Sequence, residues 1–322
     1  MPASRPPDFF IVGSPKTGTT ALYEMLREHP QIFMPALKEP HYLASELKPR
    51  PEFARDRREA PLPRTLDAYL ALFDDAPAEH RTGEASTFYL WSRTAAERIA
   101  DLQPDARIIA ILRDPASFLR SLHNMFLGWG VETEKDLRKA ISLDAARRAG
   151  NDLPARSHRP QLLQYADHVR YVEQLRRYHA HLPSDQIHVI LYEDFRRDNA
   201  ATVKGVLRFL GVDEQLPIRT LDTNVTTRTQ RSHTARYFID SLLKGRSPLA
   251  RTARRTIRRV TPQRVRRGSA QAFREHVVNT AASPPDESLM LELRHRFKPE
   301  VAALSDYLDR DLLRLWGYDE LD

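Results

Sequence analysis

Residues 13–20 read GSPKTGTT and place a lysine and three threonines among two glycines. In a glycine-rich loop between a strand and a helix, several backbone N–H groups point into one concavity, and the positive end of the helix dipole attracts an anion. Lys16 adds a positive charge, and Thr17, Thr19 and Thr20 add hydroxyl donors. We predict that the loop binds a phosphate-like group and is more than a tight turn.

The loop differs from a Walker A sequence in the place of its lysine. Gly13 and Gly18 have the G-x-x-x-x-G-K-[ST] spacing, but Thr19 stands where the lysine belongs and Lys16 lies inside the loop. The usual γ-phosphate chemistry therefore does not follow from the motif alone.

A second anion-binding residue is predicted at the end of another strand. A nucleoside triphosphatase needs an acid there to help hold Mg²⁺, whereas the apolar run at 106–114 reaches Arg113 before Asp114. A guanidinium suits a second phosphate better than a metal. The alternative is a salt bridge to Asp114 or another acid. The residues thus indicate a ligand with two separated anionic groups and no obligatory metal.

The elements that position these residues are apolar strands alternating with amphipathic helices. We predict strands at 8–13, 106–114 and 186–195 and helices after the loop and at 94–102, 118–129, 165–182 and 299–316. Such alternation favours an α/β, P-loop-like three-layer sandwich with a central parallel sheet flanked by helices. No repeat or linker divides residues 1–322, so we expect one domain. Proline-rich stretches at 49–63 and 154–160 are predicted to be surface loops near the site.

Composition narrows the chemistry further. The 322 residues are 41% hydrophobic and 29% charged and include no cysteine, which excludes disulfides, thiolate metal sites and a cysteine nucleophile. Apolar runs such as 108–112 are far too short to cross a bilayer, and the first residues lack a secretory signal pattern. We predict a cytoplasmic protein.

Three segments in this order and spacing resemble the sulfotransferases that use 3′-phosphoadenosine 5′-phosphosulfate (PAPS). PKTGTT (15–20) is similar to their 5′-phosphosulfate loop, RIIAILRDPASFLRSLHNMF (107–126) to their 3′-phosphate segment and VILYEDF (189–195) to a third landmark. LDRDLLRLWGY (308–318) extends the resemblance over nearly the whole chain.

The resemblance implies an enzyme that transfers a sulfuryl group from PAPS to a hydroxyl, with no metal required. Lys16 would stabilise the leaving phosphate, Arg113 and Ser121 would share the 3′-phosphate, and Tyr192 would lie near the nucleotide. The implied donor-binding residues are Pro15, Lys16, Thr17, Gly18, Thr19, Thr20, Arg113, Ser121, Tyr192, Arg228 and Arg231.

On the acceptor side, LKEPHYLASE (37–46) is similar to the K-E-x-H-[FY] stretch of the glycan O-sulfotransferase branch. This implies Glu39 as general base with Lys38 and His41 beside it, so that Lys16, Glu39 and His41 are the expected catalytic residues. His123 is the second choice of base. The acceptor hydroxyl stays open among small molecules, glycans and lipids.

Two basic regions lie further along the chain. Residues 224–233 contain Arg228 and Arg231, which the resemblance suggests for a loop closing on the 3′-phosphate, with KGR at 244–246 as a rival. Residues 244–267 contain ten basic and no acidic residues, so most of the +7 net charge is local. We expect a basic amphipathic helix in the segment at about 244–274. We rank three roles for it: a solvated helix that covers the core, then a surface that binds the acceptor, then a contact to acidic lipid. Nucleic acid binding is not expected.

Two other functions fit part of the pattern. A P-loop nucleotide-dependent kinase would require Mg²⁺ and a strand-end acid. A non-enzymatic module would bind nucleotide or an anionic membrane, chiefly through the basic segment.

Overall fold

A computed structural model describes residues 5–47, 62–155, 157, 159–216, 228–230, 279–281 and 285–321. The predicted positions Arg231 and 244–274 lie outside the described residues. Arg228 falls within a described backbone strand, and only its backbone is considered below.

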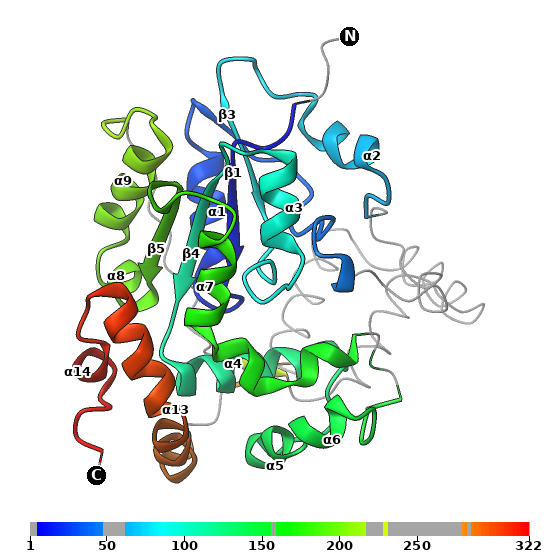
Figure 1. Ribbon diagram of the computed structural model, residues 1–322, viewed down its shortest axis with the longest axis vertical. Coiled ribbons are helices and arrows are strands. Elements are labelled where there is room, and N and C mark those ends of the chain that lie inside the picture. Colours follow the sequence, from blue (N-terminus) through cyan, green and yellow to red (C-terminus); the bar gives the residue numbers. More distant parts are fainter. Residues whose placement is uncertain are drawn as a thin grey trace, which may run out of the picture.

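A five-stranded, all-parallel sheet forms the centre of the molecule (Figure 1). Its strand order is β2-β3-β1-β4-β5. In the middle strand, Phe9 is paired with Gly83 on one side and Arg107 on the other. The strands are β1 (Phe9–Gly13), β2 (Ile32–Phe33), β3 (Arg81–Ala85), β4 (Arg107–Leu112) and β5 (Ile187–Leu191). A separate antiparallel pair is formed by β6 (Arg228–Gln230) and β7 (Asn279–Ala281).

Helices cover both faces of the sheet, as the continuous apolar strands predict. Along β1, Phe9 and Ile11 belong to one hydrophobic core, and Phe10 and Val12 belong to the other. The first core includes side chains of α1 and α9, and the second includes side chains of α3, α4, α7 and α13. Figure 1 shows α3 and α7 in front of the sheet and α1 behind it. The predicted three-layer α/β/α architecture is confirmed.

The helix bounds are as follows. The α-helices are α1 (Thr19–Arg27), α2 (Leu66–Leu70), α3 (Ala95–Leu102), α4 (Pro115–Trp129), α5 (Leu137–Ser142), α6 (Asp144–Arg148), α7 (Tyr171–His179), α8 (Tyr192–Arg197), α9 (Asn199–Leu210), α13 (Glu287–Leu308) and α14 (Leu312–Trp316). Short 3₁₀ turns are η1 (Ser45–Leu47), η3 (Ala71–Phe73), η4 (Pro160–Leu163), η5 (Tyr165–Val169) and η6 (Ser184–Gln186).

Several predicted boundaries differ from the structure. The predicted helix at 165–182 is the 3₁₀ turn η5 followed by α7. The predicted helix at 299–316 starts earlier, at Glu287, and is interrupted at Asp309, whose left-handed φ of 49° ends α13 before α14 begins. The predicted strand at 186–195 stops at Leu191. Strands β2 and β3 were not predicted, since RTGEA contains no apolar run.

The parallel arrangement brings two predicted segments to one edge of the sheet. Because β1 and β4 are neighbours, the glycine-rich loop after β1 and the Arg113–Asp114 step after β4 lie at adjacent carboxyl ends, where α/β sheets bind their ligands. Asp114 caps α4 by accepting hydrogen bonds from the N–H groups of Ala116 (3.3 Å) and Ser117 (2.9 Å). This cap fixes the direction in which α4 leaves the strand.

Candidate active site

The loop between β1 and α1 is held tightly at its base. A Cβ atom on Gly13 would lie 2.7 Å from the carbonyl oxygen of Thr87, so only glycine fits at this close approach. The hydroxyl of the fully buried Thr17 donates to the carbonyl oxygen of Ser14 at 2.7 Å. Gly18 has a left-handed φ of 88° and begins α1, whose first N–H groups have no partner within the helix. The loop is therefore a preformed turn, and the hydroxyl proton of Thr17 is used inside it.

Arg113 joins the loop to the end of β4. Its Nη1 donates to the carbonyl oxygen of Lys16 at 3.2 Å, across 97 positions of sequence. The side chain of Lys16 reaches solvent, yet its pKa is lowered, first by partial burial in the loop and then by the charge of Arg113. Two positive side chains held this close favour a bound anion between them.

Tyr192 completes this half of the site from a third element. It is the first residue of α8, it is buried, and its ring centroid lies 4.5 Å from the guanidinium carbon of Arg113. This stacking fixes the guanidinium plane. Lys16, Arg113 and Tyr192, which three separate motifs predicted, thus lie in one contiguous cluster.

Two polar atoms of the predicted 3′-phosphate residues are buried without a protein partner. Among the described residues, nothing hydrogen-bonds to Arg113 Nε or to Ser121 Oγ, and no carboxylate forms an ion pair with Arg113. Asp114, the suggested salt-bridge partner, instead accepts from α4 and from the Tyr318 hydroxyl at 2.6 Å. Burying an unsatisfied polar group costs about 1–3 kcal/mol, and a bound anion would satisfy both atoms.

The acceptor-side segment forms a second polar cluster around Glu39. Its Oε1 is 2.8 Å from Lys38 Nζ and 3.4 Å from Thr87 Oγ1, and its Oε2 is 3.4 Å from His41 Nε2. His41 is buried, and its Nδ1 has no partner among the described residues. Lys38 and His41, the other members of the predicted trio, therefore both contact Glu39.

Burial, hydrogen bonds and neighbouring charges together favour the deprotonated form of both Glu39 and His41. Burial alone would raise the pKa of Glu39, but the hydrogen bond from His41 and the charge of Lys38 outweigh it and lower that pKa to about 2. Burial lowers the pKa of His41, and the Glu39 carboxylate offsets this only in part. Near pH 7 the pair is therefore a carboxylate beside a neutral imidazole. Arg159, from the predicted loop at 154–160, also lowers the pKa of His41 by its charge.

The backbone at the predicted catalytic residues has an uncommon conformation. Lys16, Glu39 and His41 have φ angles of 66°, 60° and 53°, and the only other described non-glycine residues with positive φ are Asp152 and Asp309. The left-handed region costs roughly 1–2 kcal/mol for a residue with a Cβ. Such residues cluster at functional sites where the surrounding structure holds them.

Thr87 connects the two polar clusters. Its carbonyl oxygen makes the close approach to Gly13, at the base of the phosphate-binding loop, while its hydroxyl contacts Glu39. On the other side, the Tyr23 hydroxyl of α1 donates to the carbonyl oxygen of Pro35, just before the Glu39 segment. The candidate base is thus fixed next to the candidate anion site.

Comparison with known proteins decides the family. The model of the sulfotransferase family matches residues 7–215, which include every residue of both clusters described above. The chain belongs to the sulfotransferase family. The predicted family and P-loop-like fold are confirmed.

Proteins named as carbohydrate or heparan sulfate sulfotransferases are among the relatives of this chain. Human carbohydrate sulfotransferase 15 is 32% identical over 153 residues, covering 36% of this chain and 26% of that protein. Human heparan sulfate glucosamine 3-O-sulfotransferase 3B1 is 27% identical over 206 residues, covering 64% of this chain and 46% of that protein. The matched regions thus span a quarter to a half of these relatives. The crystal structure of a sulfotransferase from Alicyclobacillus acidocaldarius has a TM-score of 0.67 and 27% identity and covers 97% of this chain and 99% of that one.

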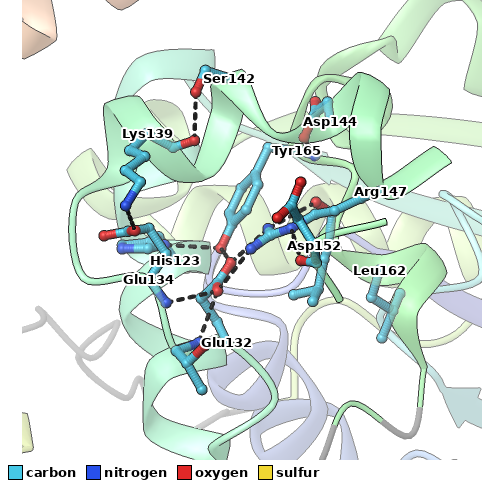
Figure 2. A network of polar contacts seen from close by, with 12 residues as sticks. His123, Glu132, Glu134, Lys139, Ser142, Asp144, Arg147, Asp152, Leu162 and Tyr165 are labelled. Carbon is cyan, nitrogen blue, oxygen red and sulfur yellow. Dashed lines mark hydrogen bonds and ion pairs between the residues drawn. The ribbon is translucent and has the colours of Figure 1, made fainter. Parts of the chain in front are cut away.

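His123, the second-choice base, lies in a different polar network of this chain (Figure 2). Its Nδ1 is 2.8 Å from the Tyr165 hydroxyl, and its Nε2 is 3.2 Å from the carbonyl oxygen of Lys135. The Tyr165 hydroxyl donates to Glu132, which forms a buried two-bond ion pair with Arg147. Because the His123 ring lies between Tyr165 on η5 and the Lys135 carbonyl in the loop after α4, the geometry favours a structural role for it.

Sequence reasoning missed the buried carboxyl of Glu84 on β3. It is 1% exposed and accepts hydrogen bonds from the hydroxyls of Tyr69 (2.6 Å) and Tyr89 (3.1 Å). Burial raises the pKa of Glu84 to about 7, although its hydrogen bonds lower it. A carboxylate next to a glycine in TGEAS was the signal available, but the partners come from other parts of the chain.

Other predicted donor residues are only partly described. Thr19 is buried at the start of α1, and Thr20 beside it is exposed. The backbone of β6, which contains Arg228, lies against α4, the helix that carries Ser121. Among the described residues, no helix is long and apolar enough to span a membrane.

Proposed function

We propose that this protein transfers the sulfuryl group of PAPS to an acceptor hydroxyl by in-line displacement. The observation that carries the proposal is the pair of unpartnered buried atoms, Arg113 Nε and Ser121 Oγ, next to a lysine-bearing anion loop. A 3′-phosphate would satisfy Arg113 Nε and Ser121 Oγ. A 5′-phosphosulfate would bind in the loop that carries Lys16. The residues present therefore fit this donor.

Lys16 and the loop amides would act on the phosphate that leaves. When the sulfur–oxygen bond breaks, negative charge grows on the bridging oxygen, and Lys16 would neutralise it. Its lowered pKa strengthens its tendency to share a proton with that oxygen. Arg113 would orient the donor through its 3′-phosphate, so that binding energy far from the sulfur fixes the reacting geometry.

Glu39 would take the proton of the acceptor hydroxyl. Its pKa of about 2 keeps it ionised but makes it a weak base, so proton transfer would occur as the hydroxyl becomes acidic in the transition state. His41 would orient the acceptor, because its buried Nδ1 is free to accept a hydrogen bond among the described residues. Lys38 would hold Glu39 in position.

A sugar hydroxyl is the first acceptor class to test. The relatives named above are a carbohydrate sulfotransferase and a heparan sulfate glucosamine 3-O-sulfotransferase, and the K-E-x-H segment is intact here. Small-molecule and lipid hydroxyls, a platform role for the basic segment at 244–274, closure by Arg228 or Arg231 and a cytoplasmic location stay predictions.

Transfer of labelled sulfate tests the proposal directly. The protein is incubated with ³⁵S-labelled PAPS and chondroitin, N-sulfated heparosan or 4-nitrophenol, and labelled products are separated. We expect transfer to a saccharide, with a loss of roughly 10²–10⁴-fold in Glu39→Gln and none in Glu28→Gln, an exposed carboxylate at the end of α1. Full turnover in Glu39→Gln would exclude Glu39 as the base.

The pH dependence of turnover follows from the protonation of Glu39 and His41. A Glu39 pKa of about 2 means that the carboxylate stays ionised from pH 5 to 8, and the lowered pKa of His41 keeps the imidazole neutral near pH 7. We therefore expect Glu39 itself to contribute no acid limb to kcat/KM near the ordinary glutamate pKa of ~4.3. An acid limb at pH 4–5 that disappears in Glu39→Gln would contradict this assignment.

A further inference from the structure

The backbone N–H groups of alternate residues hydrogen-bond the segment that carries Glu39 and His41 to residues at and just after the end of β3. The N–H of Glu39 donates to the carbonyl oxygen of Ala85 at 3.0 Å, and the N–H of His41 donates to Ser86 Oγ at 3.0 Å. The N–H of Leu43 donates to the Tyr89 hydroxyl at 3.1 Å. These three bonds hold a backbone with two left-handed residues, which would relax without them.

Glu84 lies behind this attachment. Its Oε2 accepts from the same Tyr89 hydroxyl that receives the Leu43 N–H, and its carboxyl also interacts with the hydroxyl of Ser86. A tyrosine hydroxyl that donates to a carboxylate has its oxygen lone pairs turned toward other donors. Glu84 thereby orients the Tyr89 hydroxyl to receive the N–H of Leu43 in the segment that carries Glu39 and His41.

A buried carboxyl is a costly way to fill a core position. Glu84 is 1% exposed, and its Oε1 has no partner among the described residues. The nearby Glu39 carboxylate further disfavours its charge. Burying a carboxyl group costs free energy that its hydrogen bonds only partly offset, so packing alone does not explain a glutamate.

We propose that Glu84 is a positioning residue, which holds the segment of Glu39 and His41 in place through the Tyr89 hydroxyl. This inference rests on the proposed sulfuryl transfer. It also predicts an asymmetry between two tyrosines that bind the same carboxyl oxygen. Tyr89 links Glu84 to the catalytic segment, whereas the Tyr69 hydroxyl donates only to Glu84, and its ring stacks on Tyr42 at 4.8 Å.

Removing one hydroxyl at a time separates positioning from stability. Tyr89→Phe loses the bond to Glu84 and the acceptor for Leu43 N–H; Tyr69→Phe loses one bond to Glu84 and keeps the stacked ring. We expect kcat to fall about tenfold in Tyr89→Phe and less than twofold in Tyr69→Phe, with KM for PAPS unchanged in both. Glu84→Gln keeps an acceptor oxygen and should retain most of the turnover that Glu84→Ala loses.

The same variants are compared by transfer of ³⁵S-labelled sulfate and by NMR titration of the His41 ring, assigned with His41→Asn. A His41 titration shift in Tyr89→Phe but not in Tyr69→Phe, together with the kcat asymmetry, supports the positioning role. Equal kcat losses in the two tyrosine variants, or full turnover in Glu84→Ala, would overturn it. If the wild type transfers no label, sulfuryl transfer fails, and the His41 titration alone decides: a selective shift supports positioning, and identical titrations refute it.

Discussion

At the scale of single residues, the three predicted catalytic side chains share a left-handed backbone. Lys16, Glu39 and His41 come from two loops, and each has a φ between 53° and 66°. The conformation projects the Lys16 side chain from a loop whose carbonyl oxygen is bound by Arg113, and it lets Glu39 and His41 meet at 3.4 Å. The unfavourable backbone conformations thus lie where the proposed chemistry needs a fixed geometry.

Lys16→Ala tests the most specific of these roles. We expect sulfate transfer to fall by about 10²–10³-fold, the usual effect of removing one group that stabilises transition-state charge. Binding of adenosine 3′,5′-bisphosphate should weaken far less, because that product lacks the bond that breaks. Lys204→Ala, an exposed lysine on α9, is the matched control in the transfer assay. A parallel loss of transfer and of bisphosphate binding would assign Lys16 to ground-state binding only.

At the scale of elements, the sequence predicts those whose side chains are uniformly apolar. β1 and β4 were predicted because their residues are buried on both faces, and α3 and α4 because their apolar residues recur at helical spacing. β3 was missed because its inner positions are polar, and Glu84 among them is bound by the hydroxyls of Tyr69 on α2 and of Tyr89, which follows the strand. Local pattern carries no information about such partners.

The candidate site was likewise predictable from the sequence only in part. The contact of Arg113 with Lys16 and Tyr192 was predictable, since each residue lies at a recognisable motif at a strand end. The structural role of His123 was not, because its partners Tyr165 and the Lys135 carbonyl come from the region after α4. Residue spacing within one helix cannot reveal them.

Adjacent arginines on α6 test the network that packs this region. Arg147 and Glu132 are 1% and 0% exposed and form two hydrogen bonds, whereas Arg148 is half exposed and pairs with Asp167 at 3.0 Å. Arg147→Met leaves a buried carboxylate unpaired and should lower the free energy of unfolding by about 3–5 kcal/mol. Arg148→Met should lower it by less than about 1 kcal/mol. Urea denaturation measures both, and equal losses would contradict the buried pair.

At the scale of the whole molecule, the C-terminal segment packs against the strand ends that form the site. The glycine-rich loop follows the first strand, and the C-terminal residues return to the neighbouring strand ends. There the Tyr318 hydroxyl donates to Asp114 at 2.6 Å, and Trp316 Nε1 donates to Glu193 at 2.9 Å. Tyr171 on α7 donates to the carbonyl oxygen of Arg113 at 3.0 Å. The terminal LDRDLLRLWGY segment is therefore part of the support that fixes Arg113 and its neighbours.

Recognition of a 3′-phosphate by Arg113 and Ser121 is central to the proposed function. Calorimetric titration in EDTA measures this binding most directly. Adenosine 3′,5′-bisphosphate and adenosine 5′-monophosphate are titrated into the wild type, Arg113→Ala and the exposed control Arg196→Ala. Losing charge-assisted hydrogen bonds of about 1.5–3 kcal/mol should weaken bisphosphate binding by roughly 10- to 100-fold. We predict this loss in Arg113→Ala only, with monophosphate binding unchanged. Absent bisphosphate binding in the wild type, or an equal loss for both nucleotides in Arg113→Ala, would contradict the account.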